Sequence, residues 1–416
     1  MFGLVRDRRQ GAGVDQPGRL EKVKLNLPSG MKYTPRPDKS LSGMLISGEI
    51  DAALARVLDS GWFILGPEGE AFERELAGWL GAREVVAVAN GTEAIQLALE
   101  GLGIGEGDEV VTSPLTAAFT ALAVMRAGAR PVFADLDPKT LNVSPEAVAA
   151  AVTPRTRAIL PVHLYGHPAD LDPLLALGRE RGVAVIEDAC QAIGASYKGR
   201  RVGALSGIGA LSFYPTKNLG ALGDGGAVVV QDAAVAARVR RLRNGGQSDR
   251  YRHEISGINS RLDEMQAAIL RAGLVHLAEW TERRRALADR YFAGLEGVGS
   301  LTLPRTQPYA TSAHHLFVVR HHRRDALAAA LLARGIGTLI HYPIPLHLQP
   351  AFAGMGRAGE FPVAEKAAGE ILSLPLYPEM TDAQADAVID AVRALAGPGP
   401  DRAGRGPDAP VAGPRP

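Results

Sequence analysis

Short apolar runs alternate with segments of helical periodicity through the middle of the chain. Each run has the length of a buried strand and most end at a polar or glycine-rich loop. The runs are Glu84–Ala89, Glu109–Thr112, Pro131–Ala134, Ala158–Val162, Val183–Glu187, Gly209–Phe213 and Ala227–Gln231. Between them, Asn90-Gly91-Thr92 opens a helical pattern at Glu93–Leu102, an Ala-rich helix runs to about Ala127, and Ser144 with Pro145 begins another helix. This alternation predicts a mostly parallel sheet with helices on both faces.

A second unit is predicted after a long helical region from about Met265 to Leu295. Its expected elements are the strands His315–Arg320 and Leu372–Leu376, the helix Asp325–Arg334, and a last helix to about Leu395 that the capping box Thr381-Asp-Ala-Gln384 opens. The fold class is therefore α/β, with a large domain and a smaller C-terminal α+β domain. We expect a flexible N-terminal arm at 1–40, the large domain at 41–280, the small domain at 281–396 and a disordered tail at 397–416.

Composition narrows the class of protein. Of the 416 residues, 46% are hydrophobic and 22% charged, and the formal net charge is +1, so charge gives no reason to expect nucleic acid or an anionic membrane as a partner. No run of about 18 apolar residues predicts a membrane span, and no apolar stretch follows Arg6–Arg9 as in a secretory signal. The single cysteine, Cys190, excludes an intramolecular disulfide and fits a reducing compartment. We expect a cytoplasmic protein.

Lys217 is the most informative residue of the chain, because it lies between an apolar strand and a glycine-rich loop. An amine there loses its proton at moderate cost and can attack an aldehyde as a Schiff-base nucleophile. Asp188 ends another apolar strand, where a carboxylate is costly unless it is paired, and Gln191 follows it. Together they suggest a pyridoxal phosphate (PLP) site, with the lysine for the aldehyde, the acid for the ring nitrogen and the amide for the ring hydroxyl. Taken singly, Asp188 could equally cap a helix or pair with an arginine.

A phosphate group has candidate partners elsewhere in the chain. Gly91 and Thr92 begin a helix, whose free N–H groups and dipole attract anions, and Ser212 ends a strand. Alternatively, Gly91 and Thr92 form an ordinary helix cap, and the Ser212 hydroxyl only makes hydrogen bonds within its strand region. Because ligands of open α/β sheets gather at the carboxyl ends of strands, we expect these loops to converge on one crevice.

Seven motifs in this order resemble the DegT/DnrJ/EryC1/StrS family of PLP-dependent sugar aminotransferases, of aminotransferase fold type I. The resemblance runs from about Ile50 to Leu395. The motifs are Gly61-Trp-Phe-Ile-Leu-Gly-Pro67, Asn90-Gly-Thr92, Glu187-Asp-Ala-Cys-Gln191, Ser212-Phe-Tyr-Pro-Thr-Lys217, Gly223-Asp-Gly-Gly226, Gly257-Ile-Asn-Ser-Arg261 and His341-Tyr-Pro-Ile-Pro-Leu-His-Leu-Gln349.

The resemblance implies a role for each matching residue. Lys217 would hold the cofactor and move the proton, Asp188 would pair with the ring nitrogen, and Gln191 would contact the ring hydroxyl. The phosphate would be held by Gly91, Thr92 and Ser212. Asn259 would reach the phosphate from a neighbouring subunit, which implies a homodimer with shared sites. The segment near the substrate sugar would contribute His341, Tyr342 and His347.

One position departs from the family pattern. Many members carry an aromatic residue that stacks on the cofactor ring directly after a strand-end threonine. Here Ala117 occupies that position and Phe119 follows two residues later. Either Phe119 takes over the stacking or the stacking is weaker.

The leading functional hypothesis is transfer of an amino group from glutamate or glutamine, through pyridoxamine phosphate, to a nucleotide-linked keto sugar. A free cyclitol ketone (an inosose) is an alternative substrate. A PLP-dependent sugar dehydratase is disfavoured because that branch has histidine in place of Lys217, and a non-catalytic PLP-binding regulator because the lysine, acid and amide are all present. Gly101–Glu106 lacks the last glycine of a dinucleotide fingerprint and follows a helix.

Histidine pairs at His314-His315 and His321-His322 raise the question of a metal. They flank a strand with no carboxylate or cysteine cluster nearby in the sequence, and Gly166 with Pro168 argues against a helix that would align His163 and His167. We therefore expect structural or surface histidines and no metal site.

Overall fold

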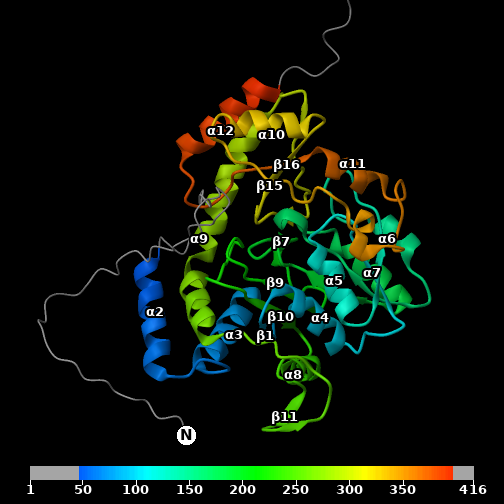
Figure 1. Ribbon diagram of the computed structural model, residues 1–416, viewed down its shortest axis with the longest axis vertical. Helices are drawn as coiled ribbons and strands as arrows, with labels where there is room; N and C mark the ends of the chain where they lie inside the picture. The colour runs from blue at the N-terminus through cyan, green and yellow to red at the C-terminus, as the bar shows by residue number, and fades with distance from the viewer. Residues whose placement is uncertain (1–45, 397–416) are drawn as a thin grey trace, which may run out of the picture. The chain divides into compact units, whose positions relative to one another are not determined.

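The computed structural model describes residues 46–396, so the predicted arm (1–40) and tail (397–416) lie outside the described residues. A central sheet crosses this part of the chain, with strands in the order β3-β2-β4-β5 in one half and β6-β9-β10-β1 in the other (Figure 1). Its strands are β1 (Glu84–Val88), β2 (Glu109–Thr112), β3 (Arg130–Phe133), β4 (Thr156–Leu160), β5 (Ala184–Val185), β6 (Glu187–Asp188), β9 (Ile208–Ser212) and β10 (Gly226–Val230). All neighbours are parallel except β10, which runs antiparallel to β9 and β1, and the predicted mostly parallel sheet is confirmed.

The two halves of the sheet meet at one extended segment. The sequence predicts a single strand at Val183–Glu187, whereas the structure divides it at Ile186 into β5, paired with β4, and β6, paired with β9. The N–H of Ile186 donates to the carbonyl of Ile159 at 2.9 Å, and the N–H of Asp188 donates to that of Pro161 at 3.0 Å. The segment therefore stays bonded to β4 and the residues that follow it as far as Asp188, while β6 also pairs with β9. It carries Asp188 to the carboxyl ends of the strands.

Helices cover both faces of the sheet, because successive strand residues point to opposite sides. Val228 and Val230 of β10 belong to a core with α4 and α8, and Ala227 and Val229 to a core with α3 and α9. The helices of the large sheet are α2 (Ser47–Ser60), α3 (Pro67–Leu80), α4 (Gly91–Gly101), α5 (Ala118–Arg126), α6 (Pro145–Ala151), α7 (Leu171–Arg181), α8 (Ala233–Leu242) and α9 (Glu264–Leu295).

The C-terminal part has its own sheet and core. Its antiparallel strands are in the order β13-β15-β16, and its core joins them to α10, α12 and the second half of α9. The elements are β13 (Leu301–Thr302), β15 (Phe317–His321), α10 (Arg324–Leu332), α11 (Pro362–Glu370), β16 (Ile371–Leu374) and α12 (Asp382–Ala396). The α/β fold class with a smaller α+β part is thus confirmed. The division into domains 41–280 and 281–396 stays a proposal, supported by the separate cores, and its boundary falls inside α9.

Smaller elements complete the described part. They are the sheet of β14 (Ala310–Thr311), β7 (Ser196–Tyr197) and β8 (Arg200–Arg201), the hairpin of β11 (Gln247–Asp249) and β12 (Arg252–His253), and the single turns η1 (Leu164–Gly166), η2 (Leu346–Leu348) and η3 (Pro350–Phe352).

Local capping signals fix several helix ends. Ser144 Oγ accepts from the N–H of Ala147 at 3.3 Å, and the Thr381–Gln384 box is reciprocal, with N–H to side-chain distances of 2.9 and 3.2 Å. Both predicted caps are confirmed. The sequence analysis did not identify α2, α3, α7, α8 or α11.

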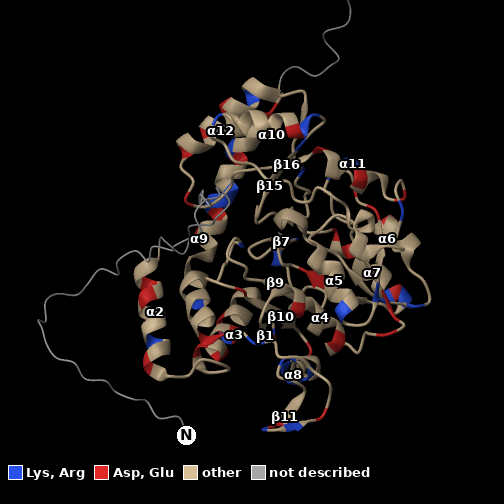
Figure 2. Ribbon diagram, viewed as in Figure 1, with Lys and Arg blue, Asp and Glu red and all other residues tan. Residues whose placement is uncertain are grey.

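Figure 2 shows charged residues on the outer helices, and some of them form ion pairs between elements. Arg271 of α9 binds Glu68 and Glu75 of α3 at 2.6 and 2.7 Å. Nearby, the buried carboxylate of Glu264 accepts from the N–H groups of Gly66, Glu68 and Gly69 and so caps the N-terminus of α3. Within residues 46–396, every helix is too short or too polar to cross a bilayer.

Candidate active site

A cavity of about 890 Å³ opens at the carboxyl ends of the central strands. Asn90 follows β1, Asp188 ends β6 and Ser212 ends β9, so the sheet brings three loops to one place. The predicted residues that line this cavity are Gly91, Thr92, Asp188, Gln191, Ser212, Lys217, His341 and Tyr342. The predicted crevice is therefore present.

Lys217 contributes an amine surrounded by protein. Burial lowers the pKa of this amine from 10.5, while nearby Cys190 and Asp188 act in the opposite direction. Its backbone N–H donates to the carbonyl of Tyr214 at 2.8 Å, and this turn carries the side chain back to the cavity. An amine whose pKa is lowered is a better nucleophile near neutral pH.

Asp188 is a buried carboxylate held by two donors. Its side chain lies at the end of β6, where Oδ2 accepts from the hydroxyl of Thr120 at 2.8 Å and Oδ1 from the N–H of Cys190 at 3.2 Å. Thr120, which reaches Asp188 from α5, is not among the site residues predicted from the sequence. Two hydrogen bonds fix the carboxylate, which lines the cavity and has further lone pairs with which it can accept from a ligand.

Gln191 is oriented by a donor and an acceptor. Its Oε1 accepts from the backbone N–H of Tyr165 at 2.9 Å, and its Nε2 donates to the hydroxyl of Tyr342 at 3.2 Å. Because an amide nitrogen carries two N–H groups, one donor is left for a ligand. Tyr165 also donates its hydroxyl to the backbone carbonyl of His341.

The start of α4 supplies a place for an anion. The Asn90 side chain caps this helix by accepting from the N–H of Glu93 at 2.9 Å. A side chain at Gly91 would put its Cβ 2.7 Å from Cβ of Ser212 and 3.0 Å from Sγ of Cys190, so only glycine fits. This close approach brings the first N–H groups of α4 beside the hydroxyls of Thr92 and Ser212, an arrangement suited to phosphate.

Histidine and aromatic side chains complete the lining. His315, which the sequence analysis treated as structural, lines the cavity, and burial together with nearby Lys217 and Arg284 holds its pKa well below 6.5. Its Nδ1 is buried without a hydrogen-bond partner within residues 46–396. Ala117 and Phe119 both line the cavity, and the Phe119 ring is 63% exposed. It stays a prediction that Phe119 stacks on the cofactor ring in place of the aromatic residue missing at Ala117, or that the stacking is weaker.

Two predicted site residues lie away from the lining of this cavity. His347 is buried against Phe361, and its Nε2 is 3.0 Å from Oε1 of Glu365, so a single chain does not present it to the cavity. Asn259 is exposed and its backbone pairs with Asn244. It stays a prediction that His347 contacts the substrate. It also stays a prediction that Asn259 contacts a neighbouring subunit.

A buried pair supports the loops beneath the site. Nε2 of His163 lies 3.1 Å from Oε2 of Glu187, and Glu187 also accepts from the N–H groups of Gly203 and Ser206, each at 2.8 Å. Burial alone would raise the pKa of Glu187, but these hydrogen bonds and His163 lower it below its ordinary 4.5. Glu187 therefore ties together the loops on either side of β6.

We expect Glu187→Ala to lower the free energy of unfolding by about 3–5 kcal/mol, because it leaves the buried His163 and the N–H groups of Gly203 and Ser206 without their partner. Urea unfolding of the two proteins measures this difference. The matched control, Glu187→Gln, keeps an acceptor oxygen and should lose less. Equal losses in the two variants would contradict this account of the carboxylate.

Most of the chain matches the model of a known protein family. The DegT/DnrJ/EryC1/StrS aminotransferase family model matches residues 45–393. The chain is 53% identical over 349 residues to the dTDP-3-amino-3,4,6-trideoxy-alpha-D-glucose transaminase of Streptomyces venezuelae, covering 84% of this chain and 92% of the relative.

Two solved structures are also similar to this chain. The crystal structure of S. venezuelae DesV has a TM-score of 0.85 and 51% identity, covering 87% of this chain and 99% of that one. NtdA of Bacillus subtilis, solved with bound cofactor PMP, has a TM-score of 0.79 and 32% identity, covering 84% of this chain and 82% of that one.

Proposed function

The chain belongs to the DegT/DnrJ/EryC1/StrS aminotransferase family, and from this premise we propose that it transfers an amino group from an amino acid to a nucleotide-linked keto sugar. The donor is glutamate or glutamine, and the product is an amino sugar nucleotide. The observation that carries the proposal is the convergence of Lys217, Asp188 and Gln191 on one cavity. Relatives named as transaminases of sugar nucleotides support the substrate class.

PLP, with pyridoxamine phosphate as its amine form, fits the residues of this cavity. Lys217 provides the amine for the aldehyde, Asp188 a fixed acid for the ring nitrogen, and Gln191 a free N–H for the ring hydroxyl. The start of α4 with Thr92 and Ser212 accommodates the phosphate. When bound, PLP acts as the electron sink for the reaction.

The residues of the chain contribute binding and proton transfer. Asp188 keeps the ring nitrogen protonated, since a buried carboxylate is stabilised by a cation beside it. Lys217 Nζ accepts a proton in one half-reaction and returns it in the other, for which its lowered pKa is suited. His315 is neutral near pH 7, so it adds a polar group beside Lys217 without a second positive charge.

A panel assay separates the substrate classes. Enzyme in the pyridoxamine form is mixed with several dTDP- and UDP-linked keto sugars and with inososes, and return of the absorbance of the lysine-bound cofactor is recorded. We expect turnover of at least one sugar nucleotide. Turnover of an inosose alone would move the substrate to the free cyclitol ketones. A protein that binds PLP but turns over none of them would favour the regulatory alternative.

We further propose a homodimer in the cytoplasm whose two sites each take Asn259 from the other subunit. The exposed position of Asn259 away from its own cavity supports this arrangement.

Mixed dimers test the shared site. Lys217→Ala and Asn259→Ala should each be nearly inactive as homodimers, since every site lacks one group. In a mixed dimer, one site combines the intact Lys217 of one subunit with the intact Asn259 of the other, so we expect activity to return at one site of the two. Activity is measured after co-expression with two different affinity tags. No recovery in purified mixed dimers would contradict sharing through Asn259.

A further inference from the structure

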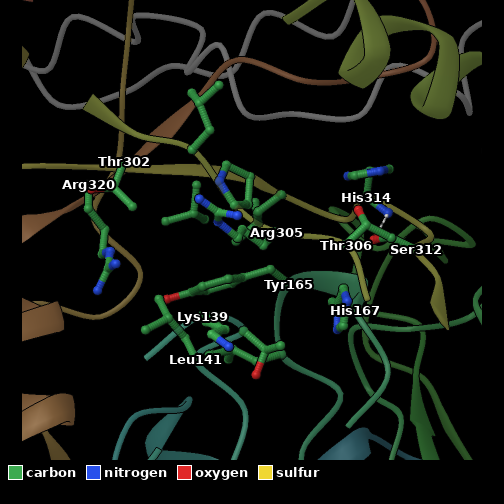
Figure 3. A pocket seen from close by; sticks show the side chains of 16 residues that line it. Lys139, Leu141, Tyr165, His167, Thr302, Arg305, Thr306, Ser312, His314 and Arg320 are labelled. Carbon is green, nitrogen blue, oxygen red and sulfur yellow. Dashed lines mark hydrogen bonds between the residues drawn. The ribbon is translucent and has the colours of Figure 1, made fainter. Parts of the chain in front are cut away.

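A second, smaller cavity has Tyr165 in its lining (Figure 3). Its lining comes from four segments: Lys139–Leu141, Leu164 to His167, Thr302–Thr306, and Ser312 to Arg320. It shares no lining residue with the candidate active site. Tyr165 forms part of its wall and also holds two active-site residues, through its N–H to Gln191 and its hydroxyl to the carbonyl of His341.

The cavity is lined by positive charge without negative charge. Lys139, Arg305 and Arg320 belong to its lining, and no aspartate or glutamate of the described residues does. Within residues 46–396, none of the three makes an ion pair with a carboxylate. Cations gathered at one cavity repel one another unless an anion lies between them, and three of them attract an anion more strongly than one. In Figure 3 the guanidinium of Arg305 points toward the space above the Tyr165 ring.

The size of the cavity restricts its occupant. It measures about 50 Å³. Since one water molecule takes about 10–15 Å³ on this measure, the space holds roughly three to five water-sized atoms. A tetrahedral oxyanion has four oxygens, whereas a nucleotide is several times too large. The hydroxyls of Thr302 and Thr306 add uncharged donors to the lining.

We propose that this cavity is a binding site for a small tetrahedral oxyanion, either inorganic phosphate or the phosphate end of a phosphomonoester. Arg305 and Lys139 are its principal charged partners, and Arg320 is a third cation of the lining. The anion lies against the Tyr165 ring and so steadies the segment that orients Gln191. The site is separate from the substrate and cofactor cavity, and the inference holds whatever the catalysed reaction proves to be.

Calorimetric titration of the full chain, saturated with PLP, with inorganic phosphate tests the site. Ionic strength is kept constant with chloride, because screening otherwise changes every charge interaction. We expect saturable binding that Arg305→Gln and Lys139→Gln each weaken at least about tenfold. The matched control, Arg334→Gln, removes an exposed arginine that does not line the cavity and should bind phosphate as the unaltered protein does.

A variant of the active site decides between the two cavities. Thr92→Val alters the candidate cofactor phosphate site and should leave the titration unchanged. Loss of binding in Thr92→Val with retention in Arg305→Gln would overturn the proposal, as would the absence of saturation at about 10 mM phosphate. Methyl phosphate, tested in parallel, distinguishes the sources: binding of both ligands indicates a phosphomonoester site, and binding of phosphate alone indicates a site for the free ion.

Discussion

Lys217→Ala is expected to lower kcat/KM for transamination by at least about 10⁴-fold, because one amine both holds the cofactor and moves the proton. Among residues 46–396 no other lysine lines the cavity, so the described part of the chain has no second amine in place to substitute for it. The measurements are steady-state kinetics and the absorbance of purified protein, which should no longer show lysine-bound cofactor. Added PLP should still bind through the phosphate and ring contacts.

The control for this variant is Lys366→Ala. Lys366 is exposed on α11, where its amine is 4.0 Å from an oxygen of the partly buried Glu370, and it is outside the cavity. Its loss should leave kcat/KM and the absorbance unchanged. A Lys217→Ala protein with near-normal turnover would remove the chemical basis of the proposed function.

Asp188→Asn is expected to lower kcat/KM by about 10²–10³-fold, because it removes a fixed negative charge from a buried site while keeping the side-chain shape. The amide oxygen can still accept from Thr120, whose hydroxyl is 2.8 Å from the carboxylate, so the fold should tolerate the change. Kinetics together with a pH titration of the bound cofactor measure the effect. The cofactor ring nitrogen should lose its proton at a lower pH in the variant.

Thr120→Val is the graded comparison for Asp188→Asn. It removes one hydrogen bond to the carboxylate but leaves the charge, and should lower kcat/KM by about tenfold. If the two variants behaved alike, orientation rather than charge would explain the role of Asp188. If Asp188→Asn turned over normally, its assignment to the ring nitrogen would be wrong.

Much of the site could be predicted because strand ends have a local signature. Asp188 and Ser212 each close an apolar run, and parallel strands place such ends at one edge of the sheet. The cap at Ser144 and the box at Thr381 are also local, and both are confirmed.

Other features depend on contacts between distant segments. Thr120 is an ordinary helix residue until α5 places its hydroxyl against Asp188, 68 residues away in sequence. His315 is buried near Arg284 of α9, and no periodicity in the sequence predicts its position beside Lys217. His347 and Asn259 were identified from motif resemblance alone, and a single chain brings neither to the cavity. For α3, the signals were present, with Pro67 in its first turn and Gly81 after its last.

The long helix α9 has a practical consequence. Its first half packs through Leu270 and Leu274 into the core of the large sheet, and its second half through Leu287 and Tyr291 into the C-terminal core. A chain cut at residue 280 would split this helix and strip each core of part of its apolar cover. The large-sheet part and the C-terminal part therefore cannot be exchanged separately. A chimaera that contained the C-terminal part of a relative would also need the whole of α9 from that relative.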